Sequence, residues 1–414
     1  MNRAHRRATG ATSTKKRPAV SSASTPLRIL FASNAPFANT GYGTQTSQLT
    51  QRMVKDGHSV AVACNYGLEG ATMEWNGVFL YPRGMSGYSE DVMKAYSMHW
   101  AAQNATLPST VITLYDVWVY NKMENLRTIP RIYSWVPVDH QPAPPDVLEW
   151  CDRPNVTPIA MSKFGEQMLT NAGIECEYAP HAIEPVFKPT RKIDTPMGRI
   201  NPRELLGVSD DAFVVMMNSA NKGVTPCRKS FGQAILAFSA FAATRKNAVL
   251  YLHTEDRGSM SGINLPELLE ACGVKPEQVR FVDQFAYRIG IPQDTLAGFY
   301  TAADVLLCPS MGEGFGIPVI EAQACGTPVI VSNFTAQPEL VGHGWTVDGQ
   351  PEWDPMQKAW FFNPSVASIV DALTRAYESP RGTSQDAIDF AKAYAADKVY
   401  AEHWKPILEK AAAE

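Results

Sequence analysis

Short apolar runs bounded by turn residues recur along this chain and alternate with stretches of helical spacing. The first run, LRILFAS at residues 27–33, leads into a loop at 34–43, an amphipathic stretch at 44–55 and a second apolar run at 59–64. Runs that are apolar throughout predict strands buried on both faces, as in parallel sheets covered by helices. Further strands of this kind are predicted at residues 111–114, 131–136, 158–161, 175–179, 212–218, 249–253, 280–282, 304–309 and 327–332.

The pattern falls into two groups, which predicts an α/β protein with two doubly wound parallel sheets. A chain of 414 residues that is 45% hydrophobic is too long for one compact core and long enough for two domains. The polar, proline-bearing stretch 188–203 is predicted to link them. In the second group, helices are predicted at 229–243 and 384–409. The aromatic stretch 345–362 is predicted to be irregular, either as a cap over a cleft or as plain packing, and packing is the default.

The first 26 residues differ in composition from the rest of the chain. Up to Arg28 there are seven Lys and Arg residues and no Asp or Glu, so the net charge of −4 divides into +7 for this segment and −11 for the remainder. The segment has no apolar h-region and too few apolar residues to fold, which predicts disorder over residues 1–25 and no signal peptide. A solvated arm is the favoured interpretation, contact with an acidic partner or nucleic acid is the alternative, and nucleic acid is not expected as a partner.

The cysteines are odd in number, widely spaced and mostly inside apolar runs. This pattern predicts reduced, buried thiols rather than disulfides or zinc ligands, and hence a cytoplasmic location. No stretch approaches about eighteen uninterrupted apolar residues, so no membrane span is expected. The seven cysteines are Cys64, Cys151, Cys176, Cys227, Cys272, Cys308 and Cys325.

The segment 310–333, SMGEGFGIPVIEAQACGTPVIVSN, places a glycine-rich loop directly before a predicted helix at 317–325. A helix start leaves unpaired N–H groups and a partial positive charge. Gly314 and Gly316 allow a diphosphate to approach the main chain, because they have no Cβ. The loop and helix therefore predict an anion site.

Two glutamates, Glu313 and Glu321, lie in this segment eight positions apart, and they supply acceptors for vicinal hydroxyls. The alternative for Glu313 is a solvated loop residue, and for Glu321 a first-turn carboxylate that complements the helix dipole. Both together in a glycine loop favour a binding site for a phosphorylated, hydroxyl-rich ligand.

Other candidate site residues follow predicted strands. Gly41 and Gly43 stand where a helix start could meet an anion, although a tight turn explains them equally well. A proline-stiffened loop presents Asp139 and His140 at the carboxyl end of a strand, where open α/β sheets place ligands. His140 could steer an acceptor hydroxyl, and capping of a turn by this pair is an equally supported alternative.

Arg228 and Lys229 stand at the start of the helix predicted at 229–243, where cations oppose the macrodipole. A bound diphosphate would explain this placement, and a pair that is merely solvated is the alternative.

The string EGFGxPxxEAxACGxPVI at residues 313–330 resembles the signature of family 4 retaining glycosyltransferases, which have the GT-B architecture, and weaker pieces of the resemblance run from about residue 27 to the C-terminus. It implies two Rossmann-like domains that face a cleft: an acceptor-side domain at 27–187 and a donor-side domain at 188–385. It also implies a C-terminal helix, at about 386–414, that crosses back to the first domain.

The resemblance implies roles for individual positions. Glu313 would lie beside the donor sugar and Glu321 would hold the ribose hydroxyls, while residues after the strand 280–282 would bind the nucleobase mainly through backbone groups. His181 fits a cleft position, although Ala182 and Glu184 depart from the usual glycine and aspartate. Many relatives also carry an arginine after the strand 212–218, where this chain has Asn218, Ser219 and Asn221, so Arg228 would compensate.

The predicted catalytic residues are Glu313, Asp139, His140, Arg228 and Lys229, and the predicted donor-binding residues are Gly41, Gly43, Gly314, Phe315, Gly316, Ile317, Glu321, Asp283, Gln284 and His181.

The predicted function is transfer of a hexose from a nucleoside diphosphate sugar to an acceptor hydroxyl, with retention at the anomeric carbon and without a metal or another cofactor. The acceptor stays open among a small molecule, a lipid, a glycan and a protein. The alternatives are an epimerase or a phosphorylase on the same architecture, and a non-catalytic module that binds sugar nucleotides.

Overall fold

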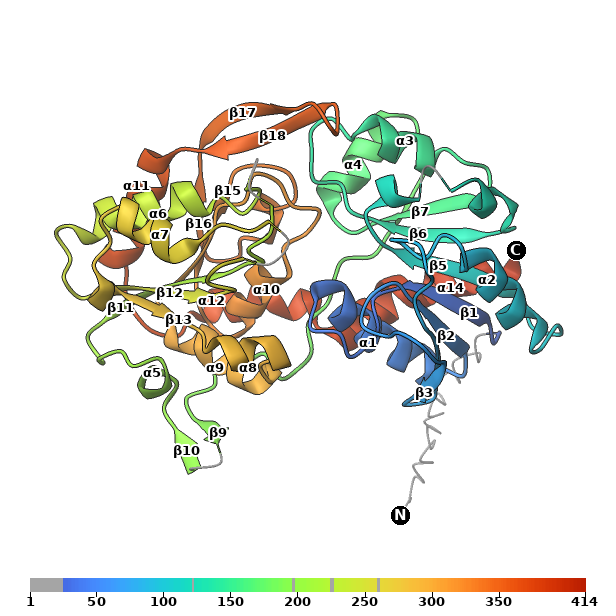
Figure 1. Cartoon of the computed structure of the whole chain (residues 1–414), viewed down its shortest axis with the longest axis horizontal. Coiled ribbons are helices and arrows are strands. Elements are labelled where there is room, and N and C mark those ends of the chain that lie inside the picture. Colours follow the sequence, from blue (N-terminus) through green and yellow to red (C-terminus); the bar gives the residue numbers. More distant parts are fainter. Residues whose placement is uncertain (1–24, 121–122, 196–197, 224–226, 259–260) are drawn as a thin grey trace, which may run out of the picture.

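The computed structural model describes residues 25–120, 123–195, 198–223, 227–258 and 261–414, and it contains two α/β units side by side (Figure 1). Apart from residue 25, the predicted N-terminal tail lies outside the described residues. The domain boundaries proposed from the sequence stay predictions, but the predicted architecture, two sheets of parallel strands, is confirmed.

The first sheet has eight strands in the order β3-β4-β2-β1-β5-β6-β7-β8, and every pairing is parallel except that of β3 with β4. Ile29 and Phe31 of the central strand β1 join the core on one face, and Leu30 and Ala32 join the core on the other. Burial on both faces explains the continuous apolar runs. The strands are β1 (Arg28–Ser33), β2 (Ser59–Cys64), β3 (Met73–Trp75), β4 (Val78–Tyr81), β5 (Ser109–Leu114), β6 (Ile132–Val136), β7 (Val156–Ala160) and β8 (Glu177–Tyr178).

The second sheet has six strands, all parallel, in the order β13-β12-β11-β14-β15-β16. A small antiparallel pair precedes it, and an antiparallel hairpin follows it. The strands are β9 (Ile193–Thr195), β10 (Gly198–Ile200), β11 (Phe213–Asn218), β12 (Ala248–His253), β13 (Val279–Phe281), β14 (Val305–Cys308), β15 (Val329–Ser332), β16 (Gly344–Val347), β17 (Gly349–Asp354) and β18 (Ala359–Pro364).

Helices connect the strands of both sheets. Among those described, none is long and apolar enough to pass through a membrane. The helices are α1 (Gly41–Lys55), α2 (Met93–Ala102), α3 (Pro145–Cys151), α4 (Lys163–Asn171), α5 (Pro202–Leu205), α6 (Phe231–Ala242), α7 (Leu265–Ala271), α8 (Gln284–Ile289), α9 (Gln293–Ala302), α10 (Ile317–Ala324), α11 (Val366–Glu378), α12 (Gln385–Ala391), α13 (Ala396–Val399) and α14 (Lys405–Ala413).

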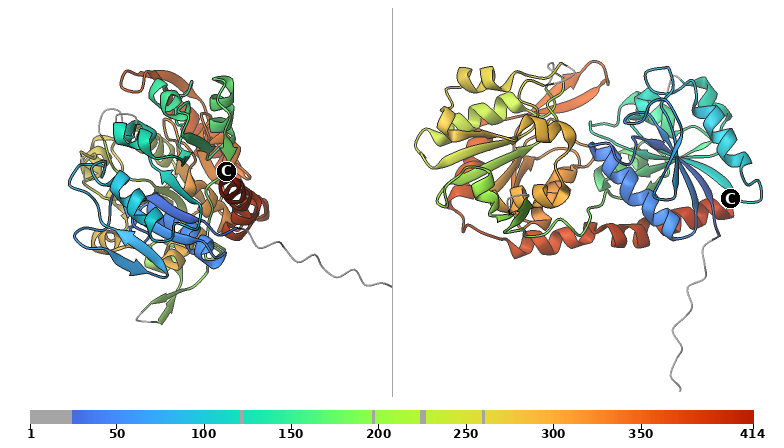
Figure 2. Two further views of the ribbon diagram at one scale, coloured as in Figure 1. Left: turned by 90° about the vertical axis from the view of Figure 1, so that its right-hand side faces the viewer. Right: turned by 60° about the horizontal axis from the view of Figure 1, so that its bottom comes forward.

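The C-terminal helical segment crosses from the second unit to the first, as Figure 2 shows in red. Trp404 packs against Trp135 with ring centroids 4.8 Å apart, and Arg131 donates to the carbonyl of Ala411 at 2.9 Å. The sequence predicted one helix at 384–409. The structure instead has α12, α13 and α14, with a π-helical turn at Tyr400–Trp404 and extended backbone at Ala395.

The prediction that residues 345–362 are irregular is wrong. They complete β16 and form most of the hairpin β17–β18, in which Trp353 faces Trp360 in register, with ring centroids 5.1 Å apart. A two-stranded ribbon gains stability from such cross-strand aromatic pairs and needs little burial of its own, so its sequence lacks a buried-strand pattern. The seven cysteines are all free thiols, and four of them, Cys64, Cys151, Cys308 and Cys325, are buried as predicted, whereas Cys176, Cys227 and Cys272 are partly exposed.

Candidate functional site

The N-terminal ends of two helices, one from each unit, meet between the sheets. Gly41 is the first residue of α1 and Ile317 is the first residue of α10; a Cβ on Gly41 would lie 3.5 Å from the Ile317 Cδ1 atom. Thr40 caps α1 and accepts from the amide of Gly43 at 2.9 Å. A side chain on Gly43 would overlap the carbonyl oxygen of Ala38, so tight packing of the loop requires this glycine. Two positive helix ends therefore point toward one place.

The glycines of the loop before α10 bring the two units into contact. A Cβ on Gly312 would overlap the carbonyl oxygen of Asp139, and a Cβ on Gly314 would lie 2.7 Å from the Cβ of Pro137. Gly316 has φ +129°, which strains any other residue. The loop 137–140 lies so close to the glycine loop that side chains at positions 312 and 314 would collide with it. This contact requires glycine at both positions, in addition to the anion binding that the sequence suggested.

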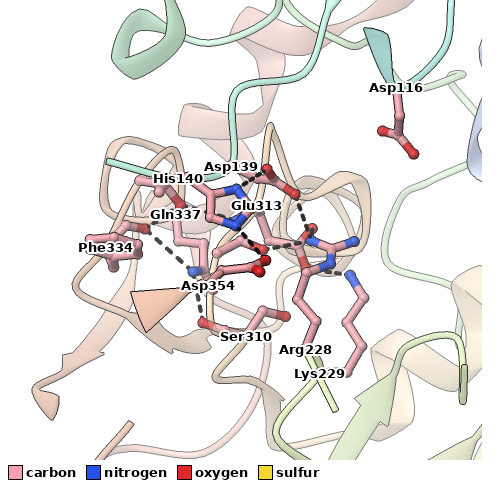
Figure 3. A network of polar contacts seen from close by, with 12 residues as sticks. Asp116, Asp139, His140, Arg228, Lys229, Ser310, Glu313, Phe334, Gln337 and Asp354 are labelled. Carbon is pink, nitrogen blue, oxygen red and sulfur yellow. Dashed lines mark hydrogen bonds and ion pairs between the residues drawn. The ribbon is translucent and has the colours of Figure 1, made fainter. Parts of the chain in front are cut away.

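Glu313 is the centre of an ion cluster on this loop (Figure 3). Its carboxylate pairs with the ammonium of Lys229 and, at 3.0 Å, with Nη1 of Arg228. The same Nη1 donates to the carbonyl of Gly312 at 2.6 Å and lies 3.6 Å from Asp139 Oδ2. The Glu313 and Lys229 side chains are only 16% and 19% exposed, so the solvated alternatives are wrong for these two residues.

The charges in this cluster depend on one another. Burial alone would raise the pKa of Glu313, but the positive charges of Lys229 and Arg228 outweigh it and lower this pKa to about 2. Lys229 has a lowered pKa because burial and the neighbouring Arg228 outweigh the attraction of Glu313. For Arg228 the carboxylates outweigh burial, and its pKa is raised. Glu313 is therefore ionised, and Arg228 beside it stays protonated.

His140 lies between two carboxylates and is almost fully buried. Its Nδ1 is 2.7 Å from Asp139 Oδ1, and its Nε2 is 3.3 Å from Oδ2 of Asp354, which ends β17. Phe361 of β18 stacks on the imidazole with centroids 3.7 Å apart. Burial would raise the pKa of Asp139, but its hydrogen bond to His140 and the charge of Arg228 lower it. Asp139 and His140 therefore belong to the ion cluster and are more than a turn cap.

The hairpin β17–β18 supplies this side of the site, which the sequence did not reveal. Gln141 and Trp360 exchange two backbone hydrogen bonds, at 3.2 and 3.1 Å, which join the hairpin to the first unit. Phe362 also donates to the carbonyl of Met311, in the glycine loop, at 2.9 Å. The sequence did not point to Asp354, because its partner His140 is 214 residues away and a contact over that separation leaves no local sequence pattern.

Asp116 is a second residue that the sequence did not single out. It follows β5 at the carboxyl edge of the first sheet, and the hydroxyl of Tyr42 in α1 donates to its Oδ1 at 3.2 Å. Figure 3 shows Asp116 at the rim of the cluster, apart from the joined residues. Its place directly after a strand was the available signal.

Glu321 is the fifth residue of α10 and is buried, so the alternative of a first-turn carboxylate is wrong. The hydroxyl of Tyr300 donates to its Oε2 at 2.8 Å. Burial raises the pKa of Glu321 to about 7, and the hydrogen bond from Tyr300 opposes this rise. This carboxylate titrates near neutral pH.

His181 packs edge to face against Phe315 of the glycine loop. The ring of His181 lies 5.3 Å from that of Phe315 and 4.3 Å from that of Trp135, and burial lowers its pKa to about 3. A neutral imidazole cannot attract phosphate by charge. Glu184, where the sequence departs from the usual aspartate, instead forms an ion pair with Arg52 at 2.7 Å.

Asp283 and Gln284 shape the start of α8 with their side chains. Asp283 accepts from the amide of Ala286 at 2.8 Å, and Gln284 bonds the backbone of Thr254 at 3.1 Å and of Asp256 at 3.0 Å. Contact with a nucleobase through the backbone here is compatible with this geometry. Within the described part of the chain, no group of three or more His, Cys, Asp or Glu residues is arranged to hold a metal ion.

Comparison with known proteins places this geometry in context. The family described as glycosyl transferases group 1 matches residues 278–394. The chain is 29% identical over 164 residues to a D-inositol 3-phosphate glycosyltransferase of Paenarthrobacter aurescens, which covers 38% of this chain and 37% of that protein. It is 48% identical over 95 residues to the O-antigen chain mannosyltransferase B of Escherichia coli, which covers 23% of this chain and 24% of that protein. The chain thus spans well under half the length of these curated relatives.

Among solved structures, the sucrose-phosphate synthase of Thermosynechococcus elongatus superposes with a TM-score of 0.70 over 94% of this chain and 100% of that one, at 17% identity. At this identity the likeness establishes the fold alone, which is GT-B. The matched segment 278–394 contains the glycine loop, Glu313 and Glu321. The segment 278–394 is thus similar to the glycosyl transferases group 1 family, and the fold of the chain is GT-B.

Proposed function

We propose that this protein transfers a hexose from a nucleoside diphosphate sugar to an acceptor hydroxyl, with retention of configuration at the anomeric carbon. The observation that carries the proposal is the convergence of Arg228, Lys229 and Glu313 on the glycine loop at the start of α10. Two cations and two helix ends favour a diphosphate, and carboxylates beside them can accept from sugar hydroxyls.

The cations have donors to spare for phosphate oxygens. The described contacts of the Arg228 guanidinium all use Nη1, which leaves Nε and Nη2 for a phosphate. Lys229 uses one of its three N–H donors on Glu313. Among the described residues, the amides of 314–317 donate no backbone hydrogen bond and α10 has no side-chain cap, so these N–H groups are also available to a phosphate. The proposed site thus neutralises the diphosphate as its charge grows during bond cleavage, which is a large catalytic effect.

Retention is proposed to proceed by departure and attack on one face of the sugar. The bond from C1 to the β-phosphate oxygen breaks, and its electron pair leaves with the phosphate. The acceptor oxygen forms its bond to C1 on the same face, and its proton passes to the departing phosphate oxygen. Glu313 and Asp139 are poor nucleophiles for the opposite face because ion pairing and hydrogen bonds lower their pKa. The proposal needs no metal ion or other cofactor.

The two ends of the donor then fall to different residues. Glu313, with Asp139 and His140 beside it, would contact the sugar. Glu321 would accept from the ribose hydroxyls, and the backbone near Asp283 would contact the base. The N-terminal helix start at Gly41, across from Ile317, would face the phosphates and the acceptor.

The test is incubation with a panel of UDP-, GDP- and ADP-hexoses, followed by NMR of the released sugar. Slow release with the anomeric configuration of the donor supports the proposal, since a transferase commonly leaks to water. Inverted sugar would overturn retention. Binding without release would favour the alternative of a non-catalytic module, and a 2-epimer of the donor would favour an epimerase.

A further inference from the structure

The nucleoside end of the site contains a chain of hydrogen bonds that the transfer reaction, as described above, does not use. Asn218 ends β11, Tyr300 lies in α9 and Glu321 lies in α10. The amide Nδ2 of Asn218 donates to the Tyr300 hydroxyl at 2.6 Å, and this hydroxyl lies 2.8 Å from Glu321 Oε2. Three separate elements therefore meet at one carboxylate.

The direction of this chain follows from the chemistry of its groups. An amide nitrogen can only donate, so the oxygen of Tyr300 accepts from Asn218. The Tyr300 hydroxyl then donates its single proton to Glu321, because an ionised carboxylate can accept a hydrogen bond but cannot donate one. Glu321 Oε2 is occupied in this way, and Oε1 remains for a ligand.

We propose that Tyr300 is a positioning residue that holds Glu321 for the ribose of the donor, and that Asn218 in turn holds Tyr300. The inference rests on the proposed function, because it concerns how the same donor is gripped. A buried carboxylate without a fixed partner would turn away or take up a proton, and either change weakens its bonds to vicinal hydroxyls.

Packing keeps Tyr300 in place independently of its hydroxyl. The residue is fully buried, Phe187 packs against the ring with centroids 6.3 Å apart, and Thr327 Oγ1 donates to the Tyr300 carbonyl at 2.6 Å. Tyr300→Phe should therefore keep the ring where it is and remove only the hydroxyl. That makes it a clean test of positioning.

The ionisable groups around Glu321 make this grip sensitive to pH. Tyr300 faces it from α9, Cys325 lies at the end of its own helix, and Cys308 of β14 lies beside Tyr300. Burial raises the pKa of both thiols, so they are uncharged near neutral pH. Loss of the Tyr300 hydroxyl removes a group that lowers the pKa of Glu321, so this pKa, already about 7, should rise further.

The experiment is calorimetric titration of the full chain with UDP, GDP and ADP between about pH 6 and about pH 9, since Glu321 titrates inside this range. For the nucleotide that binds best, wild-type affinity should rise with pH as Glu321 ionises. Tyr300→Phe should bind about tenfold more weakly near pH 7, the scale of one hydrogen bond to a charged group. The gap should narrow toward pH 9, because the part that comes from protonation of Glu321 is lost there and the part that comes from its lost orientation remains.

Two controls separate positioning from a general loss of structure. Tyr377→Phe is a matched control. It removes a hydroxyl that donates to Asn247 Oδ1 at 3.2 Å, at the opposite edge of the sheet, and it should leave binding unchanged. With the 2′,3′-dideoxy nucleotide, which carries the same phosphates, the effect of Tyr300→Phe should vanish. If Tyr300→Phe does not fold, Asn218→Ala gives the same test with a smaller loss.

No gap between Tyr300→Phe and wild type at any pH, or a gap that persists with the dideoxy nucleotide, would overturn the inference while the proposed function stands. If none of the three nucleotides binds the wild-type chain, the proposed donor site itself fails, and the inference with it.

Discussion

Two carboxylates eight residues apart, at the two ends of the proposed donor site, have opposite properties. Glu313 lies in the glycine loop between Lys229 and Arg228, and its pKa is lowered to about 2. Glu321 lies inside α10 with Tyr300 as its hydrogen-bond partner, and its pKa is raised to about 7. Glu321 is buried and the Glu313 side chain is only 16% exposed, so burial alone does not decide the outcome.

The difference is whether a positive charge shares the burial. For Glu313 the charges of Lys229 and Arg228 lower the pKa by more than burial raises it, whereas the neutral hydroxyl of Tyr300 does not offset the burial of Glu321. Glu313 is therefore charged at every physiological pH, while Glu321 is poised to change. The permanent charge of Glu313 suits electrostatic contact with a phosphorylated sugar, and the titratable Glu321 suits reversible binding of hydroxyls.

The largest expected effect comes from the charged end. Glu313→Gln should lower turnover of the complete donor by about 100-fold to 1,000-fold, the range for loss of one electrostatic catalytic group. Binding of the free nucleoside diphosphate should be unchanged or tighter, because Lys229 and Arg228 lose a competing carboxylate. Single-turnover kinetics and calorimetry measure the two quantities.

Glu352→Gln, on β17, is a matched control that removes a carboxylate outside the cluster. Equal losses of nucleoside diphosphate affinity for Glu313→Gln and Glu321→Gln would break the comparison between the two ends.

The neutral end should affect binding more than chemistry. Glu321→Gln should weaken both the sugar nucleotide and the free nucleoside diphosphate by about 1.5–3 kcal/mol at pH 8, the scale of hydrogen bonds to a charged group. Near pH 6 the loss should be smaller, because wild-type Glu321 is then largely protonated. Calorimetry at both pH values checks this, and a loss confined to the sugar nucleotide would place Glu321 at the sugar.

The strands and the donor loop could be predicted from the sequence because their causes are local. The strand Ser59–Cys64 is apolar at almost every position and was predicted with both ends correct. Glu313, Gly316 and Glu321 lie within one short segment whose spacing reflects a loop followed by a helix. Local patterns of this kind are visible in the sequence.

The partners of these residues could not be predicted, because contacts between distant segments leave no periodic trace. Lys229 and Glu313 are 84 residues apart, and His140 and Asp354 are 214 apart. The sequence placed Lys229 near the site for a different reason, a cation opposed to a helix dipole. The observed ion pair is a second cause, and nothing short of the fold reveals it.

The comparison also makes a prediction for stability. A carboxyl with a depressed folded pKa stabilises the fold above its unfolded pKa and loses this contribution as the pH falls through the folded value. For Glu313 this window runs from about 4.5 down to about 2. For Glu321 the sign is opposite: its contribution is present below about 4.5 and is lost as the pH rises through about 7.

Thermal unfolding of the two variants across this range should therefore diverge. Glu313→Gln should be less stable than wild type by about 2–3 kcal/mol at neutral pH, with the gap narrowing in acid. Glu321→Gln should be more stable than wild type above pH about 7 and equal to it near pH about 4.5. Two variants that shift in the same direction at pH 8 would contradict the assigned charge states.

A smaller effect is expected for Lys229→Ala. Arg228 remains to hold the phosphates, so nucleoside diphosphate binding should weaken by about tenfold at low salt, as for one desolvated ion pair. The loss should shrink with added salt, because screening acts on the wild-type attraction. Arg257→Ala, a mostly exposed cation outside the cluster, is the control. A loss that does not change with salt would indicate that Lys229 acts through packing.

The smallest expected effect is that of divalent ions on turnover, which tests the charged end of the site around Glu313. If Lys229, Arg228 and the two helix starts supply all the positive charge that the diphosphate needs, removal of divalent ions should leave turnover unchanged. The measurement is donor hydrolysis after dialysis against a chelator, with and without added magnesium or manganese. Restoration of a lost activity by either ion would show that the cluster around Glu313 is incomplete. In that case the low pKa of Glu313 would suit it to ligate a cation rather than to hold a sugar, because an ionised carboxylate is the ligand that such hard ions prefer.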